Sequence, residues 1–170
     1  MRLYVVRHGV AEEIGPDGDD RSRRLTPGGR RKMRIVAAGL RTLGVRLDVL
    51  LTSPMVRAAE TAAIIAEVLD QAPSPRELPA LAQGVPPVET ARGLHAFARL
   101  DHVAIVGHEP GLSGLVALLL TGSAEGLRLV LKKGGVVALE MRDPGRRGAA
   151  TMRWLLTPRQ LRRLGRRPRI

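Results

Sequence analysis

The chain has 170 residues and a hydrophobic content of 44%, which fits one domain with a packed core. It contains no cysteine, so disulfides, zinc–thiolate sites and cysteine nucleophiles are excluded, and its aromatic content of 2% disfavours a base-stacking surface for single-stranded nucleic acid. The formal net charge is +12, and all but three of the basic residues are arginine, whose guanidinium group suits phosphate and carboxylate partners.

The first half of the chain alternates apolar runs with amphipathic segments. Thr26 and Pro27 form an N-cap and a first helical position, and Ser53 with Pro54 repeats this signal. Gly44 is suited to end the first helix because glycine adopts the left-handed conformation of a helix C-terminus. The elements we predict are a strand over 2–7, a polar loop over 10–26, a helix from 27 to about 43, a strand over 49–51 and a helix from 53 to about 69.

The second half continues this alternation. The elements we predict are a proline-rich loop over 71–87, a helix over 88–100, a strand over 103–106, a helix over 111–120, strands over 136–141 and 151–156 joined by a turn at 143–148, and a short helix that Thr157 and Pro158 begin. Continuous apolar strands that alternate with helices are typical of an α/β protein. We therefore predict three layers, with a mostly parallel sheet and helices on both of its faces.

The last residues form a separate basic segment in this prediction. Residues 1–158 are assigned to one domain and residues 159–170 to a basic C-terminal tail. Such a tail is typical of a frayed, solvated terminus, and the alternative is an arm that contacts an acidic partner, nucleic acid or an anionic membrane surface. No apolar stretch reaches the ~18 residues that span a bilayer, and the N-terminal residues lack the layout of a signal peptide, so we expect a cytoplasmic protein.

Two of the four histidines lie where predicted strands end. His8 and His108 each follow a predicted strand, and Ser53 follows another. Ligands of open α/β sheets bind beyond the carboxyl ends of the strands, so we expect these side chains to meet. An imidazole beside Arg7, with Arg57 in the first turn of the next helix, can attack phosphorus while the guanidinium groups hold the phosphoryl oxygens. The sequence has no glycine-rich nucleotide loop and no zinc motif.

Four stretches of the chain resemble the histidine phosphatase superfamily, in the family's order and at similar spacing. They are Val5-Val6-Arg7-His8-Gly9, Arg23-Arg24-Leu25-Thr26-Pro27-Gly28-Gly29, Leu51-Thr52-Ser53-Pro54-Met55-Val56-Arg57-Ala58-Ala59-Glu60-Thr61-Ala62 and Val106-Gly107-His108-Glu109-Pro110-Gly111-Leu112-Ser113. The resemblance covers residues 2 to about 120, and the chain looks most like the short, SixA-type phosphohistidine phosphatases. It implies a minimal version of the phosphoglycerate mutase-like fold.

The resemblance also implies roles for the residues of the site. His8 would attack phosphorus and become a transient phosphohistidine, which water then hydrolyses. The residues that would bind the phosphoryl group are Arg7, Arg57 and His108, with Arg23 and Ser53 as further candidates. The attacking nitrogen must be unprotonated, and the neighbouring arginines predict a lowered pKa for His8. We expect no metal and no cofactor.

The identity of the general acid is open. Larger members of the family carry a carboxylic acid that protonates the leaving alkoxide, often in a long insertion before the second histidine. Here that interval, 70–102, is short and rich in proline. Glu109 and Glu77 are the candidates, and the alternative is that no dedicated acid exists. Because the imidazole of phosphohistidine leaves more easily than an alkoxide, a missing acid and a shallow, lidless site favour phosphohistidine on a protein.

Three hypotheses about function follow. The preferred one is a metal-independent, monomeric phosphatase that acts on phosphohistidine in signalling or phosphocarrier proteins, with no specific nucleic acid and no membrane as partner. The second is a phosphomonoesterase for a small metabolite. The third is a basic module that binds nucleic acid or an anionic surface, which explains the net charge but not the two histidines beside arginines at strand ends.

Overall fold

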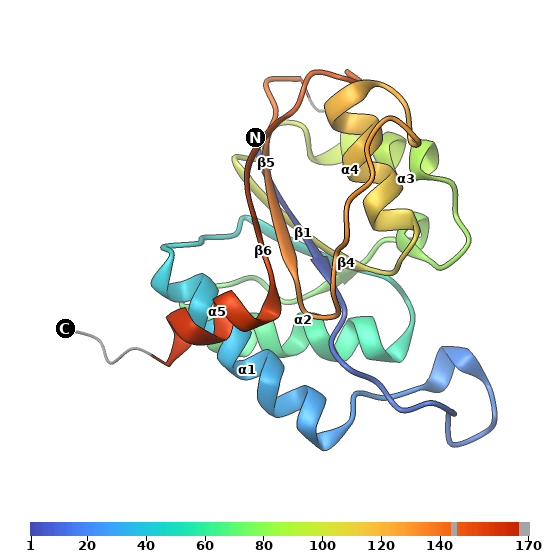
Figure 1. Ribbon diagram of the computed structural model, residues 1–170, viewed down its shortest axis with the longest axis vertical. Helices are drawn as coiled ribbons and strands as arrows, with labels where there is room; N and C mark the ends of the chain where they lie inside the picture. The colour runs from blue at the N-terminus through green and yellow to red at the C-terminus, as the bar shows by residue number, and fades with distance from the viewer. Residues whose placement is uncertain (144–145, 167–170) are drawn as a thin grey trace.

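The computed structural model describes residues 1–143 and 146–166, so the predicted turn at 143–148 and the predicted tail at 159–170 lie partly outside the described residues. In the described part, a six-stranded sheet of order β3-β2-β4-β1-β5-β6 lies between helices (Figure 1). The strands are β1 (Arg2–Arg7), β2 (Val49–Thr52), β3 (Arg76–Glu77), β4 (His102–Gly107), β5 (Val136–Glu140) and β6 (Thr151–Leu156). The α-helices are α1 (Pro27–Thr42), α2 (Val56–Val68), α3 (Pro87–Leu94), α4 (Gly111–Thr121) and α5 (Pro158–Gly165), and 3-10 turns cover Asp20–Ser22, Pro79–Leu81 and His95–Phe97.

The sheet is mostly parallel, as predicted. β1, β2, β3 and β4 run in one direction, whereas β5 is antiparallel to β1 and β6 is antiparallel to β5. Arg7 of β1 pairs with Gly107 of β4, and Thr52 of β2 pairs with Val106 of β4. The carboxyl ends of these three strands therefore lie side by side. The short strand β3 was not predicted, because its two exposed residues carry no apolar pattern.

Helices cover both faces of the sheet, which confirms the predicted three layers. α1, α2 and α5 pack on the face that presents Tyr4, Val6 and Leu50, and α3 and α4 pack on the face that presents Leu3 and Val5 (Figure 1). The residues of β1 alternate between the two clusters because successive side chains of a strand point to opposite faces. All five side chains are buried.

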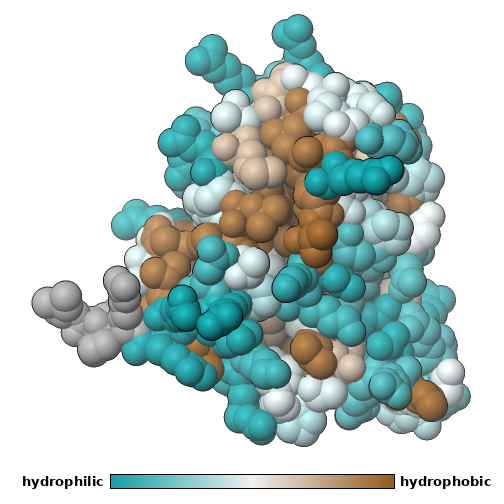
Figure 2. Space-filling model, viewed as in Figure 1, coloured by the Kyte–Doolittle hydropathy of each residue, from teal (hydrophilic) through white to brown (hydrophobic). Residues whose placement is uncertain are grey.

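One face of the molecule carries exposed apolar surface. Figure 2 shows an apolar band over the segment that precedes β5, where Leu127 is 37% and Val130 is 75% exposed. Hydrophilic side chains gather below it, over α1 and α5. Within the described ranges, none of the helices combines the length and the apolar composition that a bilayer crossing requires.

The basic C-terminal segment is a packed helix for most of its length. α5 begins with a capping box, in which the Thr157 side chain accepts from the N–H of Gln160 and the Gln160 side chain accepts from the N–H of Thr157. Leu161 is fully buried in the cluster that includes α1. A Cβ at Gly39 of α1 would lie 2.2 Å from the Leu161 carbonyl oxygen, so the two helices touch through their backbones. The interpretation of this segment as a frayed tail outside the domain is therefore wrong up to Gly165.

α2 begins later than predicted. Its first residue is Val56, and Ser53 is not its N-cap. The Ser53 N–H donates to the Val106 carbonyl over 2.9 Å, so the chain is still extended beside β4 at this point. Arg57 lies in the first turn of α2, as expected. The helix predicted over 88–100 is also shorter, because it divides into α3 and a 3-10 turn.

Candidate active site

A pocket of about 200 Å³ lies where β1, β2 and β4 end. Its lining residues are Arg7, His8, Arg23, Arg57, Gln83, His108, Glu109 and Lys133. The ring centroids of His8 and His108 lie 5.0 Å apart, and the ring planes are inclined by 51°. The structure therefore brings most of the predicted site residues into one pocket, although they come from four separate parts of the sequence.

His8 is held with one ring nitrogen engaged and the other free. The residue is 6% exposed, and its Nδ1 lies 2.7 Å from the carbonyl oxygen of Gly9. Because a carbonyl oxygen only accepts, Nδ1 carries the proton of the neutral ring and Nε2 keeps its lone pair. The turn itself is fixed, since the Gly9 N–H donates to Thr61 Oγ1 over 3.1 Å and a Cβ at Gly9 would lie 2.6 Å from Met33 Cγ. Nε2 is the nitrogen that can act as a nucleophile.

Burial keeps both imidazoles neutral. The pKa of His8 is lowered to about 3, mainly because burial disfavours the charged ring. The hydrogen bond to the Gly9 carbonyl raises this pKa, and the charges of His108 and of the two arginines lower it. Desolvation also lowers the pKa of His108 to about 4, with both arginines acting in the same direction and Asp20 opposing them. The predicted direction for His8 is confirmed. Its largest cause, however, is burial rather than the arginines.

His108 is oriented by Ser53. Its Nε2 lies 2.8 Å from Ser53 Oγ, and this hydroxyl also accepts from the N–H of Met55 over 3.3 Å. No other acceptor for the Ser53 hydroxyl proton is found among the described residues, so we infer that it donates to Nε2 and leaves the ring proton on Nδ1. Nδ1 is buried and has no partner in the described part of the chain. A buried N–H without a protein partner is available to an oxyanion in the pocket.

Two guanidinium groups lie beside the imidazoles. Arg7 donates from Nη1 to the Leu131 carbonyl over 2.9 Å, while its buried Nε has no partner among the described residues. Arg57 is 3% exposed and donates from Nη1 to the Asp20 carbonyl over 2.6 Å. From Nη2 it also donates to Asp20 Oδ2 and to Gln83 Oε1, each over 2.9 Å. These contacts fix the orientation of both guanidinium groups before any ligand binds.

Arg23 joins the same network from the loop that precedes α1. It donates from Nη1 to Asp20 Oδ1 and from Nε to the Glu12 carbonyl, each over 2.6 Å. Asp20 therefore bridges Arg23 and Arg57, and its hydrogen bonds with Arg23 and then Arg57 hold the pKa of its carboxyl below the usual range. Because Arg23 lines the pocket, it is within reach of a bound oxyanion.

Of the two predicted acids, Glu109 reaches the pocket and Glu77 does not. Glu109 accepts a hydrogen bond at Oε2 from the Ser113 hydroxyl, and its buried Oε1 has no partner in the part of the chain that the structure describes. Glu77 is exposed on β3 and does not line the pocket. The structure thus leaves Glu109 as the candidate for proton donation.

Segments distant in sequence surround the strand ends. His8 and His108 are only 6% and 5% exposed, and these segments contribute Asp20, Gln83 and Lys133. These three residues were not predicted. The one available signal was the placement of Asp20 three residues before Arg23, a spacing that permits an ion pair.

Comparisons with known proteins assign the chain to a family. The model of the histidine phosphatase superfamily (branch 1) matches residues 3–82. An uncharacterized protein of Picosynechococcus sp. is 32% identical over 145 residues, which cover 82% of this chain and 84% of that protein. The structure of the protein histidine phosphatase SixA complexed with tungstate is similar with a TM-score of 0.84 and 25% identity, over 95% of this chain and 99% of that chain. The chain belongs to the histidine phosphatase superfamily.

Within this superfamily, the chain has the architecture of the short SixA-type members. SixA of Agrobacterium tumefaciens shares the fold with a TM-score of 0.77 and 19% identity, over 92% of this chain and 97% of that chain. The mitochondrial serine/threonine-protein phosphatase Pgam5 of Drosophila virilis is 40% identical over 68 residues, which cover 40% of this chain and 23% of Pgam5. The predicted resemblance to the histidine phosphatase superfamily and to its short members is confirmed.

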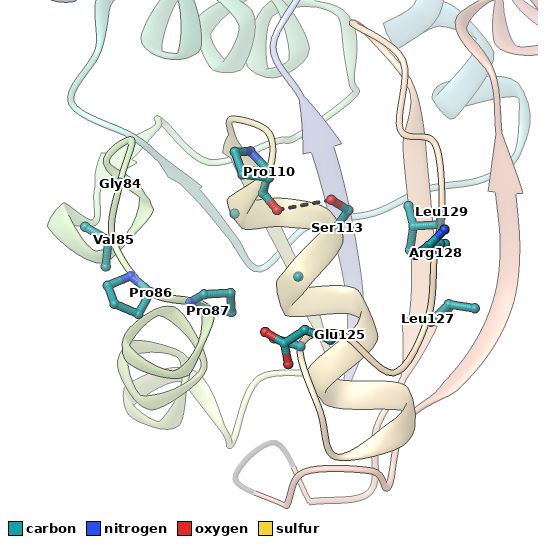
Figure 3. A pocket seen from close by; sticks show the side chains of 13 residues that line it. Gly84, Val85, Pro86, Pro87, Pro110, Ser113, Glu125, Leu127, Arg128 and Leu129 are labelled. Carbon is teal, nitrogen blue, oxygen red and sulfur yellow. Dashed lines mark hydrogen bonds between the residues drawn. The ribbon is translucent and has the colours of Figure 1, made fainter.

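The histidine phosphatase pocket is not the largest cavity in the described part of the chain. A cavity of about 660 Å³ starts beside it at Pro110. Figure 3 shows Pro86 and Pro87 on one side of α4 and Leu127 on the other, with the Ser113 hydroxyl donating to the Pro110 carbonyl over 3.1 Å. This cavity has no histidine in its lining. Among the described residues, no group of three or more His, Asp or Glu side chains is placed to hold a metal ion.

Proposed function

We propose that this protein hydrolyses phosphohistidine on other proteins through a covalent phosphoryl intermediate on His8. The observation that carries this proposal is the 2.7 Å hydrogen bond between His8 Nδ1 and the Gly9 carbonyl oxygen, which leaves Nε2 with its lone pair. A pKa of about 3 keeps the ring neutral, and thus nucleophilic, across the physiological pH range. Two arginines and a second imidazole supply the donors that a phosphoryl transition state needs.

In the first step, His8 Nε2 attacks the phosphorus atom of the substrate. An N–P bond to His8 forms, the N–P bond of the substrate breaks, and the released imidazole takes a proton from water. Arg7 Nε and His108 Nδ1 are buried donors without a partner among the described residues, and we assign them to the phosphoryl oxygens. Arg57 adds positive charge close to both imidazoles.

In the second step, a water molecule attacks the phosphorus of phosphorylated His8. The N–P bond to His8 breaks, inorganic phosphate leaves, and His8 returns to its neutral form. The proton that the attacking water loses neutralises the hydroxide left when the released imidazole was protonated. One water is consumed for each phosphoryl group released. We propose that no metal takes part, because guanidinium and imidazole groups already face the charge of the phosphoryl oxygens, so a chelator such as EDTA should leave the rate unchanged.

A small phosphate monoester is the second candidate substrate, and Glu109 is the observation that favours it. Its Oε1 has no partner among the described residues and belongs to a side chain that lines the pocket, where a carboxyl group is placed to assist a leaving alkoxide. The imidazole of phosphohistidine is a better leaving group than an alkoxide and depends less on a general acid. We expect Glu109→Gln to lower kcat on a phosphate monoester by about 100-fold, and kcat on phosphohistidine by less than about threefold.

The test compares the wild type with His8→Ala on a histidine-phosphorylated phosphocarrier protein and on p-nitrophenyl phosphate. We expect the wild type to act on the phosphoprotein, and His8→Ala to act on neither substrate. Rapid quenching of the wild type with labelled substrate should trap an acid-labile, alkali-stable label on His8. Equal activity in His8→Ala would overturn the mechanism, and turnover of the monoester alone would reverse the order of the two substrates.

The proposal extends to the setting in which the protein works. We propose that it acts as a cytoplasmic monomer on signalling or phosphocarrier proteins, and that its positive charge serves acidic protein partners rather than a specific nucleic acid. Light scattering of the purified protein tests the first part, since a dimer would contradict it. Direct comparison of phosphoproteins with duplex DNA as ligands tests the second.

A further inference from the structure

A second cavity, of about 400 Å³, opens beside the candidate active site. It lies where the end of β1 meets α1, the segment before β5 and the start of α5. Arg7 and Lys133 line both this cavity and the pocket that contains His8, so the two spaces adjoin each other. We call it the basic cavity, because its further lining residues Lys32, Lys132 and Arg162 are also cationic.

The basic cavity combines a positive rim with an apolar floor. Met33 and Val36 are buried and form the floor, and Val10 is an exposed apolar residue of the lining. No carboxylate lines the cavity, and none of its three lysines nor Arg162 forms an ion pair within the part of the chain that the structure describes. These cationic residues lie on α1, on α5 and in the segment before β5. The positive charge of the cavity therefore comes from three parts of the sequence that the fold brings together.

These features indicate an anionic ligand that is larger than a single ion. Like charges from three segments repel one another, and a bound anion removes that repulsion. Figure 2 shows hydrophilic side chains over the region where α1 and α5 lie. The apolar floor suits a ligand that also carries a hydrophobic side chain. Because the cavity adjoins the pocket through Arg7 and Lys133, one molecule can place a phosphoryl group in the pocket and an anionic side chain in the cavity.

We propose that the basic cavity binds acidic side chains of the protein whose phosphohistidine enters the active site. This inference rests on the proposed function. When a phosphohistidine side chain reaches His8, the surface around it must cover the neighbouring cavity, because the two spaces share Arg7 and Lys133. Carboxylates on that surface then face Lys132 and Arg162, and an apolar side chain contacts the floor.

The test reverses two charges of the rim that lie outside the catalytic pocket, in Lys132→Glu/Arg162→Glu. The matched control is Arg46→Glu/Arg99→Glu, which makes the same charge change at exposed positions before β2 and β4, at the opposite ends of these strands. The two substrates are a histidine-phosphorylated phosphocarrier protein with an acidic surface and free phosphohistidine. Thermal unfolding checks that each variant folds, and Lys132→Gln/Arg162→Gln replaces the test variant if the glutamates prevent folding.

We expect the test variant to lower kcat/KM on the phosphoprotein by about 20-fold at low salt, mainly through KM, and the difference to shrink at 0.5 M salt. Activity on free phosphohistidine should change by less than about twofold, and the control should change neither substrate by more. An equal loss on both substrates, or no difference from the control, would overturn the inference while the proposed function stands. Binding of the test variant to duplex DNA is also compared with that of the wild type. If the test variant binds DNA more weakly but keeps wild-type kinetics on the phosphoprotein, the cavity is a nucleic-acid site and the inference is overturned. A wild type that hydrolyses neither substrate would remove the proposed function itself.

Discussion

The stability of the folded protein should fall between pH 7 and pH 5, because two histidines are buried in their neutral forms. The pKa of an unfolded histidine is about 6.5, whereas those of His8 and His108 are about 3 and about 4 in the folded protein. In this window the unfolded chain binds protons at both residues and the folded chain does not. Protonation therefore favours unfolding as the pH falls, and the loss begins near the unfolded pKa.

The magnitude follows from the linkage relation. For one histidine with an unfolded pKa of about 6.5 and a folded pKa well below 5, the free energy of unfolding falls by about 2 kcal/mol between pH 7 and pH 5. For His8 and His108 together the fall is about 4 kcal/mol. The result does not depend on the folded pKa values in detail, because any value near 4 or below leaves both rings unprotonated at pH 5. Carboxyl groups with lowered pKa values, such as Asp17, Asp20 and Glu67, protonate below this window.

The assay is urea unfolding at the two pH values, followed by the fluorescence of Trp154, the one tryptophan of the chain. His8→Asn is the informative variant, since an asparagine amide can keep donating to the Gly9 carbonyl but does not titrate. Between pH 7 and pH 5, we expect the free energy of unfolding of this variant to fall by about 2 kcal/mol less than that of the wild type. His95→Asn is the control, because His95 is exposed, and it should lose as much as the wild type. A His8→Asn variant that also loses as much as the wild type would refute the reasoning, since His8 would then be protonated in the folded protein at pH 5.

Further predictions concern the orientation of His108 and the packing of α5. Ser53→Ala removes the hydroxyl that lies 2.8 Å from His108 Nε2. We expect kcat on phosphohistidine to fall by about 10-fold or more, with a smaller change in KM. An unchanged kcat would show that Ser53 does not determine which nitrogen of His108 carries the proton. Gly39→Ala places a Cβ against the Leu161 carbonyl and should lower the free energy of unfolding by about 1–3 kcal/mol in chemical denaturation. Gly28→Ala, whose Cβ would meet its nearest neighbour at 3.8 Å, is the control and should be neutral or stabilising by up to about 1 kcal/mol. Leu161→Ala should lower the free energy of unfolding by about 2–5 kcal/mol. A decrease below about 1 kcal/mol would mean that the packing of α5 contributes little to the stability of the domain.

The parts of the fold that were predicted correctly depend on local patterns. Continuous apolar runs located β1, β2, β4 and β5, because a strand buried on both faces needs apolar side chains at every position. The Thr26-Pro27 and Thr157-Pro158 signals located the starts of α1 and α5, because capping depends on neighbouring backbone groups. Ser53-Pro54 carries the same signal, but there the chain stays extended, since the Ser53 N–H bonds to Val106 of β4. A contact across 53 positions overrode the local preference.

The sequence by itself determined which residues lie at the ends of the parallel strands, and with them His8, His108, Ser53 and, one turn further on, Arg57. Only the tertiary structure decided what surrounds them. Asp20, Gln83 and Lys133 reach the site from segments that carry no motif, and α5 packs on α1 instead of fraying. Burial, which is a property of the whole packed chain, is also what lowers the two histidine pKa values. Short-range patterns specify elements and their ends, whereas desolvation and contacts between distant segments exist only once those elements are packed.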